Sequence, residues 1–184
     1  MYIGAISMRY AKALLMFANE AGVASKVYQE ALTLRKSFRE VPELRHVLDK
    51  PVMTKENKMQ LLVQASGGDI SLQMRKFFEL VLKEKREKFL VNINQSFIDL
   101  YRKQEKIRVG KLITAVPIAS EEVERIRKIV VDHAGGTAEF ATKVDPSIEG
   151  GFIFEINTYR LNASIADQMR RIKQQFIEKN RRIV

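Results

Sequence analysis

The hydrophobic periodicity of this 184-residue chain changes once, between residues 103 and 107. Before this point, apolar residues recur every three or four positions, which is the spacing of one face of an α-helix. After it, residues 107–116 are rich in β-branched side chains, which is typical of a strand. We therefore predict two domains, 1–105 and 106–184.

The first domain is predicted to be a six-helix bundle. Five of the six expected helices carry an apolar stripe, and the first four end near a glycine or proline, residues that interrupt helices. Short turns between successive helices favour packing of neighbours against each other in a bundle. The expected helices cover residues 4–21, 25–40 and 43–49, a segment that Thr54 caps, and residues 71–85 and 88–103.

The second domain is predicted to be a small α/β domain, so the fold class is α+β with two domains. Ser120 and Ser164 are expected to start its two helices. The last helix is expected to turn its apolar stripe into the domain core. That stripe consists of Ile165, Met169, Ile172 and Phe176, and the expected strands cover 107–116, 138–144, 152–156 and 159–162.

Positive charge is concentrated at the C-terminal end. The net charge is +10, and residues 164–184 hold six basic residues against two acidic ones. Arg170, Arg171 and Lys173 would form a basic helix face suited to an acidic protein, an anionic lipid or nucleic acid. A face that is merely solvated remains the alternative.

Catalytic chemistry finds little support in the sequence. The chain has no cysteine, its two histidines are His46 and His133, and neither the G-x-x-x-x-G-K-[ST] nor the G-x-G-x-x-G motif occurs. We expect no enzyme activity, no cofactor and no metal site. The sequence also lacks an apolar run of ~18 residues, a secretion signal and a mitochondrial transit peptide, so no membrane span and no export are expected.

A turn and strand near the C-terminus carry the most distinctive motif. Asp145-Pro146 is expected to form a tight turn that the Asp145 carboxylate caps, and Gly150-Gly151 allows backbone conformations that a Cβ would forbid. A short apolar strand, 152–156, follows, and then comes Leu161-Asn162-Ala163-Ser164-Ile165. Together these segments resemble the C-terminal signature of the F-type ATP synthase delta subunit, which mitochondria call the oligomycin sensitivity conferral protein.

The resemblance extends over nearly the whole chain in the expected order. The segment 10–14, Tyr-Ala-Lys-Ala-Leu, is similar to the opening helix of delta subunits, Arg86 stands where arginine is usual, and 113–118 resembles the first strand of the second domain. Asn162 departs from the family, which commonly has aspartate there. Both side chains can fix the turn, but only aspartate adds a charge.

The resemblance implies a non-catalytic stator subunit that takes part in ATP synthesis and hydrogen ion transport. Such a subunit joins the catalytic head to the peripheral stalk, and it lies peripherally at the cytoplasmic face of the bacterial inner membrane. Its bundle receives the N-terminal helix of an alpha subunit, and its second domain meets the C-terminal end of the b subunit. We expect Arg170, Arg171 and Lys173 to contribute to the stalk contact.

Five residues are candidates for the groove that holds the alpha-subunit helix. An amphipathic helix that lies in a groove of a bundle would bury its apolar face against such side chains. Each candidate is also a plausible core residue on its own pattern. The candidates are Tyr10, Ala13 and Leu14 in the first helix, and Phe78 and Leu82 in the fifth.

An RNA-binding helical module is the alternative function. The basic charge fits it as well as it fits the stator. However, the chain has no aromatic and basic RNA-binding motif, and a helical module leaves the strand-rich second half unexplained. Specific nucleic-acid binding is therefore not expected.

Overall fold

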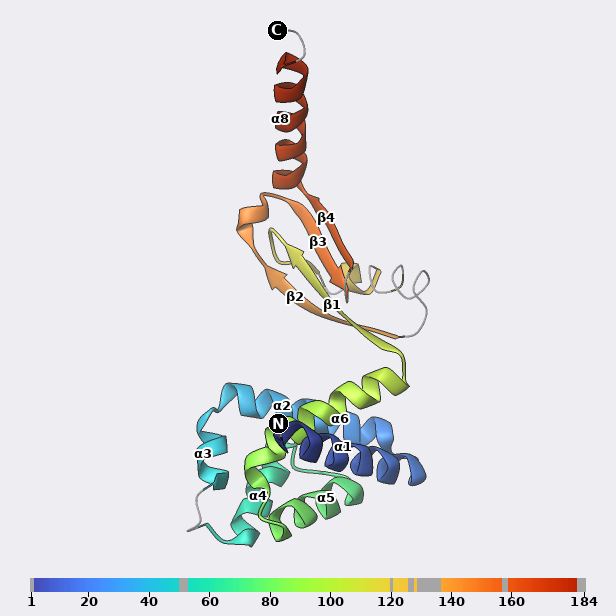
Figure 1. The fold of residues 1–184 in the computed structure, drawn as a ribbon, viewed down its shortest axis with the longest axis vertical. Helices are drawn as coiled ribbons and strands as arrows, with labels where there is room; N and C mark the ends of the chain where they lie inside the picture. The colour runs from blue at the N-terminus through green and yellow to red at the C-terminus, as the bar shows by residue number, and fades with distance from the viewer. Residues whose placement is uncertain are drawn as a thin grey trace. The chain divides into compact units, whose positions relative to one another are not determined.

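The computed structural model describes residues 2–49, 53–119, 121–125, 128, 137–156 and 159–181 (Figure 1). It divides into two compact units, Met1–Gln104 and Glu105–Val184. The described part is mostly helical and carries one small mixed sheet in the second unit, so the fold is α+β.

Unit 1 consists of helices that begin and end close to the residues predicted from their caps and breakers. The hydroxyls of Thr54 and Ser71 accept hydrogen bonds from the backbone N–H groups of Asn57 and Met74, both at 3.3 Å, and so cap two helices. The elements are α1 (Tyr2–Glu20), α2 (Ala24–Glu40), α3 (Glu43–Asp49), α4 (Lys55–Ala65), α5 (Leu72–Lys83), the 3-10 turn η1 (Glu87–Phe89) and α6 (Leu90–Gln104).

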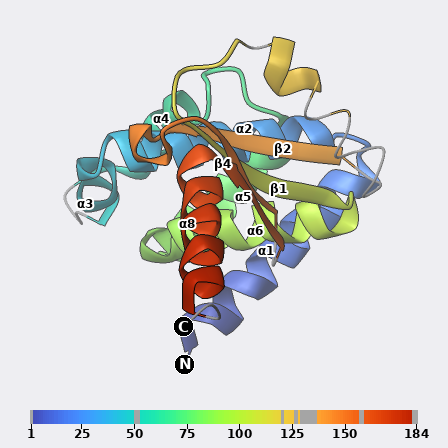
Figure 2. The same cartoon turned by 90° about the horizontal axis from the view of Figure 1, so that it is seen from above.

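The core of unit 1 is built around α6, which packs along α1 and α2 (Figures 1 and 2). The rings of Tyr28 and Tyr101 stack with centroids 4.3 Å apart. The buried Asn94 side chain donates a hydrogen bond to the Ala31 carbonyl at 2.9 Å. Because the buried Asn94 amide has a hydrogen-bond partner, the contact between α2 and α6 is specific as well as apolar.

Unit 2 contains a four-stranded sheet in the order β2-β1-β3-β4. β1 is parallel to β2 and antiparallel to β3, and β3 is antiparallel to β4. The helix expected after Ser120 falls mostly outside the described residues. The elements are β1 (Ile107–Thr114), β2 (Thr137–Val144), the 3-10 turn η2 (Pro146–Ile148), β3 (Gly151–Ile156), β4 (Tyr159–Ser164) and α8 (Ile165–Arg181).

The turn between β2 and β3 has the predicted chemistry. The Asp145 carboxylate accepts hydrogen bonds from the Ser147 backbone N–H at 3.1 Å and from its hydroxyl at 2.6 Å. Gly151 has φ 72°, and a Cβ there would collide with the Ala163 carbonyl oxygen of β4. The sequence therefore needs glycine at 151 for two independent reasons, backbone conformation and close approach.

The predicted inward stripe of α8 is wrong. Ile165, Met169, Ile172 and Phe176 are 47%, 58%, 46% and 65% exposed. Within unit 2, α8 contacts β4 and η2 near its start and then leaves the sheet (Figure 1). The core of this unit lies instead at Ile113, Ile148 and Ile153. Helical spacing reveals that a face is apolar, but not whether the chain itself covers that face.

Candidate functional site

Two cation–π contacts connect α1 to α5 and to the turn after it. The Arg86 guanidinium lies 5.6 Å from the centroid of the Tyr10 ring, and the Lys76 ammonium lies 6.0 Å from that of Phe17. Both rings are half-buried. They hold one edge of α1 against α5 and leave polar and aromatic groups at the surface.

The structure separates the five groove candidates into two sets. Leu14, Phe78 and Leu82 are buried in the core of unit 1, with at most 3% exposure. Ala13 is exposed and Tyr10 is half-buried. Only these two can offer an appreciable surface to a partner without rearrangement of the unit, and their role in binding stays a prediction.

Sequence reasoning missed two exposed apolar residues near Ala13 and Lys76. Met16 is 63% exposed and lies three positions after Ala13, and Leu80 is 44% exposed and lies four positions after Lys76. Residues at these spacings share a helix face. In the sequence both residues can be found as apolar residues that stand outside the main stripe of their helix. We call Tyr10, Ala13, Met16 and Leu80 the α1/α5 surface.

A second exposed surface is the apolar stripe of α8, which consists of Ile165, Met169, Ile172 and Phe176. Spacings of four, three and four match the alternating a and d positions of a heptad repeat, which place side chains along one seam between paired helices. We call these four residues the α8 stripe. Its exposure and spacing make it suited to bind another helix.

Helical spacing places Arg170 and Arg171 on the side of α8 opposite the stripe and Lys173 at its border, and the two arginines share an acidic neighbour. The Asp167 carboxylate lies 2.9 Å from Arg171 and 3.8 Å from Arg170. Lys173 is exposed. Because all three cations are exposed, each pair contributes little energy, and their summed potential matters more than any single contact.

The departure at Asn162 preserves the turn that starts α8. The Asn162 side-chain oxygen accepts hydrogen bonds from the Ser164 backbone N–H at 3.1 Å and from its hydroxyl at 2.7 Å. The Ser164 hydroxyl in turn accepts a hydrogen bond from the Asp167 N–H at 3.3 Å. This arrangement parallels the one at Asp145, so the turn does not require a charge at position 162.

The described residues offer no constellation for metal chemistry. Among them, no group of three or more His, Cys, Asp and Glu side chains is arranged to hold a metal ion. No helix in the same part of the chain is long and apolar enough to span a membrane. The prominent features of the described residues are the two exposed surfaces named above.

Comparison with known proteins shows the family of the chain. The family model for the ATP synthase delta (OSCP) subunit matches residues 6–176. The ATP synthase subunit delta of Phocaeicola vulgatus is 58% identical, and that of Bacteroides thetaiotaomicron is 50% identical, with all of each chain covered. A chain from the mitochondrial ATP synthase hexamer of Toxoplasma gondii shares the fold, with a TM-score of 0.62 at 22% identity over 93% of this chain and 97% of its own.

The chain belongs to the ATP synthase delta (OSCP) subunit family. It is therefore a non-catalytic stator component of the ATP synthase, part of the peripheral stalk, and peripheral to the membrane-bound complex. This assignment accounts for the strand-rich second unit. It takes the place of the RNA-binding alternative.

Proposed function

We propose that the two units divide the stator function between them. Unit 1, the predicted six-helix bundle, binds the N-terminal helix of an alpha subunit through the α1/α5 surface. Unit 2 binds the C-terminal end of the b subunit through the α8 stripe, at the cytoplasmic face of the bacterial inner membrane. The observation that supports the proposal most strongly is the exposure of all four apolar side chains of that stripe.

An exposed apolar helix gains stability when a partner covers it. Isolated helices of this length are marginal in water, because nucleation is costly and only packing of the apolar face offsets it. α8 has 17 residues, and its main contacts with the described elements of unit 2 are with β4 and η2. Burying a large apolar side chain contributes about 1.5–3 kcal/mol. A b-subunit helix alongside the α8 stripe would supply this burial.

The basic flank of α8 would act on the rate of encounter. Arg170, Arg171 and Lys173 lie on the other faces of the same helix and are exposed. Rim charges of this kind attract an oppositely charged partner over about a Debye length, ~8–10 Å at physiological salt. They select an acidic helix, while the apolar stripe supplies most of the affinity.

The head contact would rest on the α1/α5 surface. Ala13 leaves room for a partner backbone, Met16 provides an exposed apolar contact on the next turn of α1, and Leu80 provides one on α5. Methionine adapts its shape to irregular partners. An amphipathic helix with apolar residues every three or four positions would fit such a surface.

The test measures binding of purified b subunit to the full-length chain with Met169 and Phe176 both changed to serine. Affinity should fall about 30-fold or more, because about 2 kcal/mol of apolar burial is lost. The melting temperature should stay within a few degrees, since both side chains are exposed in the free chain.

Met16→Ser is the matched control, because it removes an equally exposed apolar side chain from unit 1. It should leave b-subunit binding unchanged. Unchanged binding of the double variant would exclude the α8 stripe as the stalk contact. A large loss of thermal stability would show that the stripe packs inside the free protein.

A further inference from the structure

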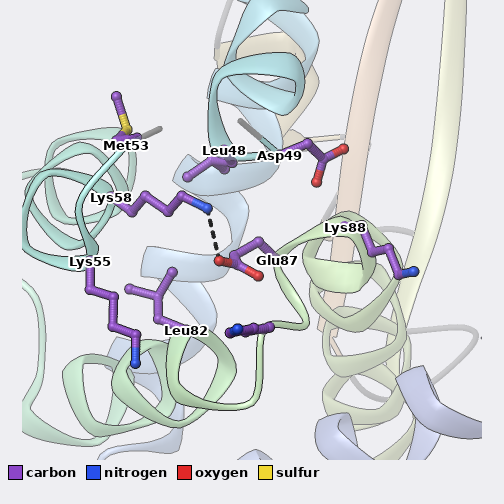
Figure 3. Close-up of a pocket in the computed structure, with 9 residues that line it drawn as sticks. Leu48, Asp49, Met53, Lys55, Lys58, Leu82, Glu87 and Lys88 are labelled. Atoms are coloured by element: carbon purple, nitrogen blue, oxygen red, sulfur yellow. Dashed lines mark hydrogen bonds and ion pairs between the residues drawn. The ribbon is translucent and has the colours of Figure 1, made fainter. Parts of the chain in front are cut away.

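Unit 1 also contains a pocket that lies apart from the α1/α5 surface. It has a volume of about 540 Å³ and opens between the end of α3, α4 and the turn that joins α5 to α6 (Figure 3). Leu48 and Leu82 are buried in its wall, and Met53 is half-buried. Because the two leucines are only 2% and 3% exposed, the apolar surface open to a ligand comes mainly from Met53 and the aliphatic stems of the lining lysines.

A buried ion pair forms part of the wall. The Lys58 ammonium lies 2.9 Å from the Glu87 carboxylate, and the two side chains are 9% and 13% exposed. This pair joins α4 to η1. Because each charge neutralises the other, Glu87 opposes the approach of an anion only weakly.

The rim of the pocket is basic. Lys55, Lys85 and Lys88 are exposed lining residues, and among the described lining residues the carboxylates are Asp49 and Glu87. Two hollows adjoin this pocket. One shares Leu48, Asp49, Glu87 and Lys88 with it and adds Arg45. The other shares Lys55 and Leu82 with it and adds Lys83, Glu56 and Glu79. An acidic ligand is thus favoured electrostatically.

The arrangement of the lysines favours an extended acidic ligand over a compact one. In Figure 3 the side chains of Lys55 and Lys88 point in different directions, and Lys58 points at Glu87. A single phosphate is held best by donors that converge on it. Carboxylates spaced along a polypeptide can instead meet separate lysines while an apolar side chain between them enters the pocket.

We propose that this pocket is a docking site for an acidic segment of another protein. The segment places one apolar side chain against Met53 and the aliphatic stems of the lining lysines, and its flanking carboxylates pair with Lys55, Lys85 and Lys88. The site does not depend on the proposed head and stalk contacts. It would give unit 1 a second attachment point.

The test uses the full-length chain and a fluorescent 12-residue peptide with a central leucine flanked by glutamates. The peptide should bind, and a peptide with glutamine in place of each glutamate should not. A variant with Lys55, Lys85 and Lys88 all changed to glutamine should bind about tenfold more weakly, because up to three exposed ion pairs are lost. Replacing the central leucine by serine should also weaken binding.

A charge-matched control variant carries Lys26, Lys36 and Lys103 changed to glutamine, all exposed residues outside the pocket. It should bind the peptide like the unchanged chain. An equal loss in both variants would overturn the proposal, because the attraction would then be a property of net charge alone. Pyrophosphate that displaces the peptide at equal concentration would also overturn it, in favour of a small-anion site.

Chemical-shift mapping on the unchanged chain protects the test against a variant that fails to fold. Addition of the peptide should shift the backbone amide signals of Lys55 and Glu87 more than those of Lys26 and Lys36. Shifts centred elsewhere would place the peptide on another surface and contradict the proposal.

Discussion

Asp145 illustrates how one side chain fixes a turn in unit 2. The hydroxyl and the backbone N–H of Ser147 both donate to its carboxylate, and the hydroxyl contributes most to holding the pKa of Asp145 below its ordinary value. A lowered folded-state pKa means that the ionised form stabilises the fold at pH values above the pKa of the unfolded chain. This contribution is lost as the pH falls through the lowered folded-state pKa.

Changing Ser147 to alanine should raise the pKa of Asp145 toward its ordinary value, because one of the two donors is removed. Carbon-13 NMR titration of the carboxyl group measures this midpoint. Ser96→Ala, which changes a serine of α6 in unit 1, is the control and should leave the midpoint unchanged. An unchanged midpoint in the Ser147 variant would mean that the hydroxyl does not stabilise the carboxylate.

Gly151 is the residue at which the turn tolerates least change. Alanine at this position would adopt a left-handed conformation at a cost of ~1–2 kcal/mol and would crowd the Ala163 carbonyl oxygen. We expect Gly151→Ala to lower the free energy of unfolding of unit 2 by about 2–3 kcal/mol in urea denaturation. Gly4→Ala, in a helix with open space around it, should be neutral or stabilising. Equal stability of the two variants would contradict this account.

At the scale of elements, the sequence predicts local structure better than burial. The helix start at Thr54 follows from cap chemistry, which involves only neighbouring residues. The spacing of the α8 stripe predicts a face buried in the core of unit 2, although α8 extends beyond the sheet. An apolar stripe has the same spacing whether its own domain or a partner covers it. Tertiary packing, which the spacing does not contain, decides between the two.

The same limit applies to the groove candidates on α1 and α5. Periodicity places Leu14, Phe78 and Leu82 on the apolar stripes of their helices, and all three are core residues. Ala13 and Tyr10 lie on the same helix as Leu14, but Ala13 is exposed and Tyr10 is half-buried. Met16 and Leu80 were overlooked because they stand outside the main stripes.

Ala13→Glu should weaken binding of a peptide that copies the N-terminal helix of an alpha subunit by at least ~2 kcal/mol, through steric and desolvation costs. Isothermal titration calorimetry with the full-length chain measures the affinity, and circular dichroism checks the fold. Lys36→Glu, an exposed change on α2, is the control and should bind normally. Normal binding by a folded Ala13 variant would remove Ala13 from the interface.

At the scale of the whole molecule, the change of periodicity near residue 105 coincides with the end of α6 at Gln104 and the start of β1 at Ile107. Residues 103–106 are exposed, and Lys106 has a left-handed backbone with φ 53°. A change of period can be found in the sequence because it needs no knowledge of tertiary contacts. How the units bind other subunits cannot be found in this way.

Limited proteolysis should cleave between the units and release a stable N-terminal fragment of about 105 residues, because exposed connections are cut before packed elements. Mass spectrometry of the fragments locates the cut. First cleavage inside α2 or α6, or loss of the whole chain without an intermediate, would contradict independent units.

The central claim is that this chain connects the catalytic head to the stalk, and a tethering assay tests it most directly. Purified head complex of alpha and beta subunits is immobilised, the full-length chain is added, and the retained b subunit is measured. The account predicts retention only when the chain is present, with loss for Ala13→Glu and for the Met169→Ser, Phe176→Ser double variant. The Ala13→Glu variant should still bind free b subunit, and the double variant should still bind the head. Retention of b subunit without the chain, or at an unchanged level with both variants, would contradict the account.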